Sequence, residues 1–232
     1  MKPAPLSPET LAALLEIDTC SLSNAIETFN VRLRNEGFAN ATIRSVTPCP
    51  RPVAGYAVTA RIRSSSPPMV GGAYVDRTDW WSHILTIPGP KIAVIEDVDA
   101  TPGLGSFLGE THTRILQALG CVAAVTNGAV RDLPAITASG FKLFGNHVSV
   151  SHAYVHVVDF GNPVTVGGLE VRPGDLLHAD LHGVLSVPAQ IASQLPPAAA
   201  QLAERERRVI DLCQSPHFSI EKLRDAVRGV FN

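Results

Sequence analysis

Hydrophobic residues in the middle of the chain gather into short runs that alternate with polar or glycine-containing segments. The runs at 91–97 and 121–126 are almost continuously apolar, and the stretch at 53–62 is rich in β-forming residues. Runs that stay apolar at successive positions are typical of strands buried on both faces, as in parallel sheets. The pattern therefore predicts buried strands at the centre of the fold.

The segment between the two apolar runs predicts how they are connected. A glycine-rich loop at 102–109 precedes a helix over 110–119, which Gly120 ends in the manner of a C-cap. A strand–loop–helix–strand unit of this kind requires a parallel pair with a right-handed crossover. A short helix over 133–139 and a third parallel strand at 142–144 extend the arrangement.

Helical spacing is found near the start of the chain. Residues 8–36 are predicted to be helical, with Ser7 as the cap and a second helix beginning near Ser21 or Ser23. A further short helix is predicted at 79–85, before a Pro-Gly-Pro turn.

The last third of the chain follows two other patterns. Residues 155–187 are dense in β-branched residues and turns, which predicts antiparallel strands that close a barrel or form a second layer. An Ala/Gln/Glu/Arg-rich composition then predicts a long helix over 191–213 and a last helix opened by Ser219. We therefore expect an α/β domain over 1–190, including the N-terminal helices, and a C-terminal helical extension over 191–232 for oligomerisation or capping.

Composition supports a folded domain without a charged binding surface. Hydrophobic residues make up 45% of the 232 residues and charged residues 17%, which is enough to bury a core and argues against disorder. The formal net charge is −2, and no lysine- or arginine-rich run is present. We therefore expect no nucleic-acid partner and no anionic membrane surface as partner.

Cysteine usage and hydropathy bear on the compartment. The four cysteines lie far apart, with no CxxC pair, so a disulfide framework or structural zinc site is not expected. Nowhere do about 18 consecutive apolar residues occur, as a membrane-spanning helix would need, and the N-terminus lacks the apolar stretch of a signal peptide. The expectation is a soluble, cytoplasmic protein with reduced thiols.

Candidate chemistry lies where the two apolar strands end, because ligands bind beyond the carboxyl ends of parallel strands. The loop after 91–97 leads to a helix N-terminus at Gly109-Glu110-Thr111-His112, whose unpaired amides favour an anion. The loop after 121–126 supplies Arg131, which can hold a carboxylate with two hydrogen bonds, and Asp132, a hard oxygen ligand. Together they predict a site for a divalent cation and a 2-oxo acid.

Simpler interpretations of these residues stay open. Arg131 and Asp132 also fit a surface ion pair, and Glu110 fits a first-turn acid stabilised by the helix dipole. The glycines also suggest a dinucleotide site, but the third glycine comes one residue late and the following strand does not end in an acid. No nucleotide cofactor is therefore expected, and the same mismatch argues against a methyltransferase that binds S-adenosylmethionine.

Several short motifs follow one another in the order found in a known family: Gly109-Glu110, Asn127-Gly128-Ala129-Val130-Arg131-Asp132, Pro173-Gly174-Asp175, Ala179-Asp180-Leu181-His182-Gly183-Val184 and Val187-Pro188. The chain resembles the RraA-like proteins and the 4-hydroxy-4-methyl-2-oxoglutarate (HMG/CHA) aldolases, whose members are often mislabelled dimethylmenaquinone methyltransferases. The resemblance covers roughly residues 20–190, and the Gly-Ala-Val-Arg-Asp string is its most specific part.

The resemblance implies an α/β/β sandwich similar to the swivelling phosphohistidine-type domain, assembled as a homotrimer or homohexamer with sites between subunits. It also implies a class II aldolase or decarboxylase in which Mg²⁺ or Mn²⁺ polarises a pyruvate enolate. Asp132 would then bind the metal directly, Glu110 would hold a metal-bound water, and Arg131 would bind the substrate. Amides of Gly109, Glu110, Thr111 and His112 would hold the pyruvyl carboxylate.

Two positions depart from the family pattern. Ala135 stands where aldolases of the family carry a carboxylate, three residues after Asp132. This change resembles the RraA-type branch, whose members regulate ribonuclease E by binding it. His112 replaces an apolar residue, and both a pocket role and an exposed position at the helix start stay open for it.

The remaining histidines and two aspartates have structural interpretations. His147, His152, His156, His178 and His182 lack a metal-ligand spacing and are expected to be strand or turn residues. Asp175 and Asp180 are expected to hydrogen-bond their own turns.

The sequence is consistent with three functions. The first is a metal-dependent carbon–carbon lyase for pyruvyl-containing 2-oxo acids, acting by retro-aldol cleavage or oxaloacetate decarboxylation. The second is a non-catalytic RraA-type regulator that binds a protein partner such as ribonuclease E. The third is an unrelated small-molecule reaction on the same scaffold.

Overall fold

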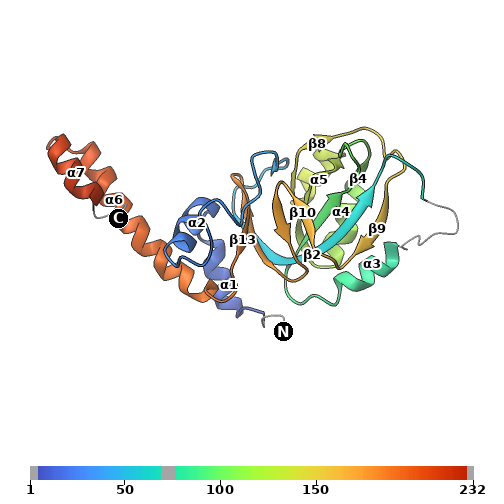
Figure 1. Ribbon diagram of the computed structural model, residues 1–232, viewed down its shortest axis with the longest axis horizontal. Helices are drawn as coiled ribbons and strands as arrows, with labels where there is room; N and C mark the ends of the chain where they lie inside the picture. The colour runs from blue at the N-terminus through green and yellow to red at the C-terminus, as the bar shows by residue number, and fades with distance from the viewer. Residues whose placement is uncertain (1–4, 69–76, 229–232) are drawn as a thin grey trace.

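A mixed sheet forms the centre of the computed structural model, which describes residues 5–68 and 77–228 (Figure 1). Its middle strands are β2 (Val53–Arg63), β3 (Lys91–Asp97), β5 (Cys121–Thr126) and β7 (Lys142–Gly145), and each neighbouring pair is parallel. Nearly every residue of β3 and β5 is buried, as their unbroken apolar runs predict. The predicted parallel core is confirmed.

Antiparallel strands extend this sheet at both sides. β12 (Leu176–Asp180) pairs with the first part of β2 and with β13 (Gly183–Val187), while β9 (His156–Phe160) pairs with the last part of β2. At the other edge, β1 (Arg44–Ser45) pairs with β7. β1 also contacts β13, and Phe38 in the segment before β1 forms a bridge to Leu185 of β13, so the sheet is nearly closed.

The two faces of the sheet are covered by different layers. Helices α3 (Arg77–Ile84), α4 (Glu110–Ala118) and α5 (Leu133–Ser139) pack on one face through buried side chains such as Trp80, Leu116 and Ile136. The hairpin of β10 (Val164–Val166) and β11 (Leu169–Val171) packs on the other. This is the α/β/β sandwich that the resemblance implied.

A second, small parallel sheet lies beside the helices and was not predicted. It consists of β4 (Ser106–Leu108), β6 (Ala129–Val130) and β8 (His147–Val148), in that order. Each strand has only two or three residues. Strands this short leave no periodic pattern in the sequence, and residues 106–108 were therefore assigned to a loop.

The N-terminal helices are shorter than predicted. They are α1 (Pro8–Leu15) and α2 (Thr19–Glu27), the second capped by Asp18, whose Oδ1 accepts from Ser21 N at 2.9 Å. The prediction of helix as far as residue 36 is wrong beyond α2. Asn30 has a left-handed backbone with φ 51°, which no helix interior accommodates.

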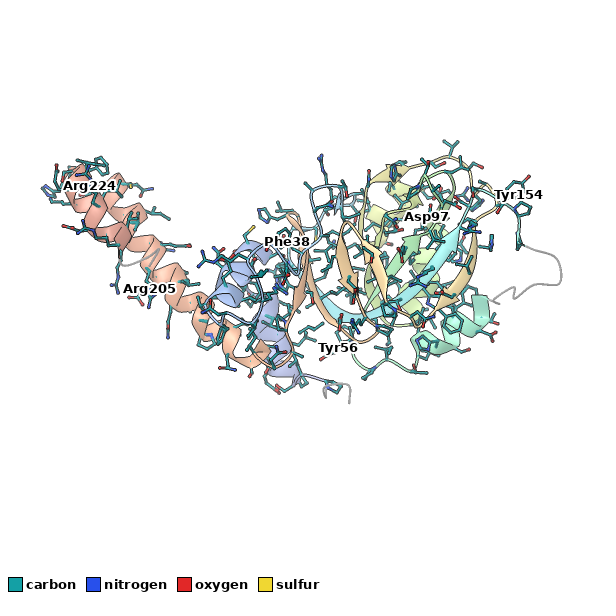
Figure 2. All side chains as sticks on the ribbon, viewed as in Figure 1. Phe38, Tyr56, Asp97, Tyr154, Arg205 and Arg224 are labelled. Carbon is teal, nitrogen blue, oxygen red and sulfur yellow. The ribbon has the colours of Figure 1, made fainter. Side chains whose placement is uncertain are left out.

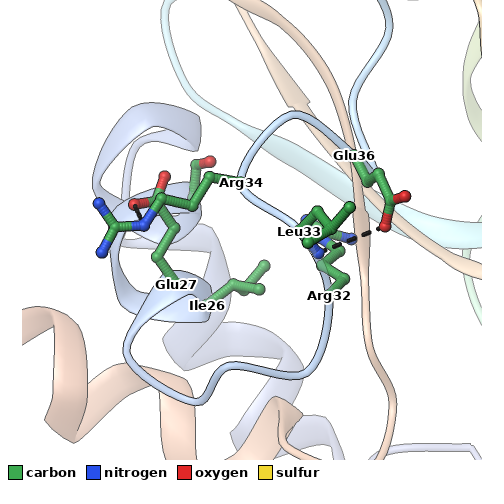
Figure 3. A pocket seen from close by; sticks show the side chains of 7 residues that line it. Ile26, Glu27, Arg32, Leu33, Arg34 and Glu36 are labelled. Carbon is green, nitrogen blue, oxygen red and sulfur yellow. Dashed lines mark hydrogen bonds and ion pairs between the residues drawn. The ribbon is translucent and has the colours of Figure 1, made fainter.

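A tertiary contact holds the non-helical segment that follows α2. Arg32 Nη1 donates to the carbonyl oxygen of Ser186, 154 positions away, at 2.8 Å. Figure 3 shows the small hollow beside this segment, whose lining includes an Arg34–Glu27 ion pair of 3.4 Å. Its volume is about 10 Å³, which is room for one water and no larger ligand.

The C-terminal helices form an arm. A short 3₁₀ turn (Ala192–Gln194) leads into α6 (Leu195–Gln214), and α7 (Ile220–Arg228) folds back on it. The start of α6 is buried against the N-terminal helices. The rest of α6, which carries Arg205, extends away from the body together with α7, which carries Arg224 (Figure 2). The predicted long helix and final helix are confirmed. Within the described ranges, none of the helices combines the length and apolarity that a bilayer crossing needs.

Candidate functional site

The small sheet brings the two predicted loops together. β4 follows the glycine-rich loop and leads into α4, whereas β6 follows β5 and leads to Arg131 and Asp132. β4 and β6 pair in parallel, and Arg131 N donates to the carbonyl oxygen of Leu108 at 2.9 Å. The two halves of the site therefore meet edge to edge, as expected for loops at the carboxyl ends of neighbouring parallel strands.

Gly109 allows this approach because it lacks a side chain. A Cβ at this position would lie 2.6 Å from Asp132 Oδ2 and 3.1 Å from Arg131 Nε. The backbone of Gly109 has an ordinary extended conformation, with φ −124°. A larger residue at this position would therefore displace the Asp132 carboxylate from its place beside α4.

Asp132 has a strained backbone and a carboxylate turned toward α4. Its φ of 57° lies in the left-handed region, and although it is the N-cap of α5 its side chain makes no capping bond there. Oδ2 instead accepts a hydrogen bond from the Glu110 amide at 3.1 Å. The side chain is 41% exposed and is therefore open to a ligand.

Arg131 has few partners within the described chain. Its Nε lies 3.5 Å from Asp132 Oδ2, and its Nη1 lies at the same distance from the Val150 carbonyl oxygen. Nε is buried and makes no hydrogen bond to any described residue. A guanidinium carries five N–H donors, so this side chain retains capacity for an anion.

The start of α4 is only partly available to an anion. The Glu110 amide is committed to Asp132, and the Glu110 carboxylate is half exposed, 4.0 Å from Arg114. Gly109 provides no side-chain cap for the helix. One amide of the predicted anion-binding cluster therefore supports the Asp132 carboxylate instead.

A cavity of about 320 Å³ lies over these residues. Five of the predicted site residues line it together, namely Gly109, Thr111, His112, Arg131 and Asp132, whereas the sixth, Glu110, is not part of the described lining. Sequence reasoning missed the other lining residues, Trp81, Ile115 and His152. His152 was expected to be a strand or turn residue, and the pairing of β8 beside β6 brings its loop to the cavity.

Asp97 and Asn127 hold the two loops in register, a role that was not predicted for either residue. Asp97 N donates to Asn127 Oδ1 at 2.7 Å, and Asn127 Nδ2 donates to the Asp97 carbonyl oxygen at 3.0 Å. The Asp97 carboxylate accepts from Gly103 N at 2.9 Å. Burial raises the pKa of this carboxyl. The glycine-rich loop is therefore bound to its own strand end.

Asp99 also helps to anchor the glycine-rich loop, through Ser64. Its carboxylate accepts four hydrogen bonds from the amides and hydroxyls of Ser64 and Ser65, between 2.6 and 3.0 Å. Burial acts to raise the pKa of Asp99, but these bonds outweigh it and the pKa is lowered. The Ser64 hydroxyl in turn accepts from Gly105 N at 3.2 Å. The sequence signal that could have identified Asp97 and Asp99 is the position of two carboxylates at the end of a buried strand.

The structural interpretation of Asp175 and Asp180 is confirmed. Asp175 Oδ2 accepts from Arg172 N at 2.8 Å within its turn, and Asp180 Oδ1 accepts from His182 N at 2.8 Å. Asp180 Oδ2 also accepts from Thr19 N at 2.9 Å, which joins α2 to β12. His178 is fully buried beside it.

The donor set near Asp132 suits a hard cation that keeps much of its water. In the described part of the chain, no group of three His, Cys, Asp or Glu side chains is placed to hold a metal. Mg²⁺ is usually bound by one or two carboxylates, with water and substrate oxygens as its other ligands. The exposed Asp132 carboxylate fits such a site, whereas a closed zinc-type site does not fit.

The sequence is similar to a known protein family and to a named relative. The sequence matches the RraA-like family, described as Aldolase/RraA, over residues 19–186. A protein of Halalkalibacterium halodurans named "Putative 4-hydroxy-4-methyl-2-oxoglutarate aldolase" is 29% identical over 142 residues. The aligned stretch covers 59% of this chain and 66% of that relative, which is just under two thirds of its length.

Solved structures share the fold at low sequence identity. An uncharacterized protein from Pseudomonas syringae has a TM-score of 0.72 and 23% identity, covering 95% of each chain. Streptomyces coelicolor RraAS2, described as an unusual member of the RNase ES inhibitor RraA protein family, has a TM-score of 0.67 and 20% identity, covering 88% of this chain and 98% of its own. At these identities the likeness concerns the fold.

Proposed function

This chain belongs to the RraA-like family, and from that premise we propose that it is a divalent-metal-dependent carbon–carbon lyase for pyruvyl-containing 2-oxo acids. The reaction would be retro-aldol cleavage of a 4-hydroxy-2-oxo acid or decarboxylation of oxaloacetate. Both pass through an enolate, whose developing negative charge the site must stabilise.

One observation carries the proposal. Arg131, Asp132 and the start of α4 line one cavity of about 320 Å³, and the pairing of β4 with β6 holds the two loops together. A surface ion pair would need no such convergence. The long contacts of Arg131 also leave its guanidinium with donors for a substrate.

Each residue has a role that follows from its chemistry. Arg131 would bind the substrate carboxylate by charge-assisted hydrogen bonds. The amides of Thr111 and His112 at the start of α4 would donate to the same anionic group. The Glu110 amide would keep the Asp132 carboxylate turned into the cavity, at the 3.1 Å contact already described.

A metal ion would complete the site. Asp132 would hold Mg²⁺ or Mn²⁺ directly, and the Glu110 carboxylate would hold it through a water. The bound cation would supply Lewis-acid stabilisation of the enolate charge.

Pyruvate release tests the proposal directly. Metal-free protein is incubated with oxaloacetate, Mg²⁺ or Mn²⁺ is added, and pyruvate is followed with time. We expect activity that appears with the metal and is lost in Asp132→Ala. Asp211→Ala, on the exposed side of α6, is the matched control and should behave as wild type. Silence with oxaloacetate and several 4-hydroxy-2-oxo acids, with no metal bound, would refute the lyase.

A regulator of RraA type is the second candidate. Two observations favour it: Ala135 supplies no carboxylate in the first turn of α5, and the described residues form no three-ligand metal cluster. Such a protein would bind ribonuclease E and slow RNA cleavage. A cleavage assay with ribonuclease E distinguishes the two, because a lyase alone would leave the cleavage rate unchanged.

A further inference from the structure

The cavity has two walls of different chemistry. Gly109, Thr111, Arg131 and Asp132 form the polar wall already assigned to the pyruvyl end of a substrate. Trp81, His112 and Ile115 form a second wall of two aromatic rings and an aliphatic side chain, and His152 completes the described lining. The second wall therefore faces whatever the substrate carries at its other end.

Trp81 presents carbon to the cavity. Its Nε1 is buried and makes no hydrogen bond with the described residues, although the residue as a whole is partly exposed. The exposed part of the indole is therefore the carbon of its rings. Such a surface suits a flat apolar group, because aromatic rings bury large areas against one another.

Stacking fixes the orientation of His112. Its ring lies parallel to that of Phe107, with centroids 4.5 Å apart and 23° between the planes. Trp81 meets the same ring edge-on at 6.4 Å and 66°. Phe107 is 2% exposed and lies in β4, so this layer of rings is anchored in the small sheet. The aromatic wall is thus preorganised.

Charge limits what can bind opposite Arg131. Among the described lining residues, Arg131 is the single lysine or arginine. One carboxylate of a substrate can therefore be paired with a permanent cation. A second carboxylate at the far end would find no further lysine or arginine among the described lining residues, and burying a charge without a cationic partner is costly.

We propose that Trp81 and His112 are specificity-determining residues that favour 4-hydroxy-2-oxo acids with an aromatic group at C4 over those with a second carboxylate there. This inference rests on the lyase function proposed above. A cavity of 320 Å³ is at the lower end of the roughly 300–1,000 Å³ found for small-molecule sites, which suits one ring beside a pyruvyl group.

The cleavage itself is balanced without a further reactant. The C4 hydroxyl loses its proton to water as the C3–C4 bond breaks, and the electron pair of that bond forms the pyruvate enolate. The enolate then takes a proton from water at C3. With a phenyl group at C4 the products are pyruvate and benzaldehyde.

Paired substrates test the selectivity. With Mn²⁺ present, kcat/KM is measured from pyruvate release for 4-hydroxy-2-oxo-4-phenylbutanoate and for 4-hydroxy-4-methyl-2-oxoglutarate. We expect wild type to favour the phenyl substrate by about tenfold or more. Trp81→Ala and His112→Ala should each lower this ratio about tenfold, whereas Trp81→Phe keeps a ring in place and should retain it. Leu85→Ala, 63% exposed just after α3, is the control.

A binding measurement separates this inference from the lyase proposal. Calorimetry compares two acids that cannot be cleaved in this way, 2-oxo-4-phenylbutanoate and 2-oxoglutarate, which differ by phenyl against carboxylate at C4. Tighter binding of the phenyl acid without any lyase activity would support the aromatic wall and refute the lyase. Preference for 2-oxoglutarate, or a ratio that neither alanine variant changes, would overturn the inference.

Discussion

At the scale of single residues, two positions shape the site: Gly109, which has no side chain, and Asp132, whose backbone is strained. Gly109 leaves the space that Asp132 Oδ2 occupies, since a Cβ there would lie at 2.6 Å. Asp132 adopts a left-handed conformation that costs about 1–2 kcal/mol for a non-glycine residue. The cost is offset in part by the hydrogen bond from the Glu110 amide. Strain of this kind is typical of functional positions.

Arg131 gives the clearest test at this scale. Arg131→Ala should weaken oxalate binding by about 10- to 100-fold, because a hydrogen bond to a charged group is worth about 1.5–3 kcal/mol. Titration calorimetry in the presence of Mg²⁺ measures the change. Arg205→Ala, on the exposed arm, is the matched control for losing one positive charge. Unchanged oxalate affinity in Arg131→Ala would contradict the carboxylate role.

At the scale of elements, paired hydrogen bonds between strand ends and loops decide the geometry. The reciprocal Asp97–Asn127 bonds join the ends of β3 and β5, and the short β4–β6 pairing continues this contact up to Gly109 and Arg131. A different set joins α1 and α2 to the sheet. The His178 ring in β12 contacts Thr19 Oγ1 at 3.0 Å and the Leu14 carbonyl oxygen at 3.1 Å.

The His178 contacts predict a pH dependence of stability. Burial lowers the pKa of His178 from its ordinary value of 6.5, while Asp180 and Asp18 act in the opposite direction. Below about pH 6.5 the unfolded chain therefore binds a proton at His178 that the folded chain does not. The stabilising contribution is complete above this pH and falls, by at most about 1.4 kcal/mol per pH unit, as the pH approaches the lowered pKa.

Urea unfolding between pH 5 and 7.5 measures this effect. His178→Gln keeps an N–H donor near the Leu14 carbonyl but does not titrate, so its free energy of unfolding should fall less than that of wild type toward pH 5. His217→Gln, at an exposed turn between α6 and α7, should follow the wild-type curve. Parallel curves for wild type and His178→Gln would contradict the prediction.

At the scale of the whole molecule, the arm and the site lie far apart. Figure 2 places Arg224 at one end of the long axis and Tyr154, two residues from the cavity-lining His152, at the other. The arm of one chain therefore does not cover its own site. Ile210, Phe218 and Ile220 on the arm are each about half exposed, and a partner chain that covered them would bury apolar surface.

We expect the arm to take part in self-association. Light scattering of the full chain should give a multiple of the 24.6 kDa chain mass, with a trimer or hexamer as the expectation from the family resemblance. A double change of Ile210→Glu and Phe218→Glu should lower this mass. Leu85→Glu, at an apolar position on the body that is 63% exposed, should leave the mass unchanged. A wild-type mass of one chain would contradict the prediction.

Several parts of the fold could be predicted because they depend on local pattern. β3, β5, α5 and the long C-terminal helix agree with the predicted segments to within a few residues. The helix predicted beyond α2 was wrong, because the Arg32 contact to Ser186 is tertiary and leaves no periodic signal. The site residues at the two strand ends were also recognisable, since chain order alone brings such loops to one edge of a parallel sheet.

The sequence by itself determined the parallel core, the two loops and the residue types that suit an anion and a hard cation, because burial periodicity and side-chain chemistry are local properties. The tertiary structure alone decided which of those groups meet. The pairing of β4, β6 and β8 sets Gly109 against Asp132, and the packing of α3 beside α4 places Trp81 against His112. Contacts between residues 22 or more positions apart depend on the packing of whole elements, which no local pattern records.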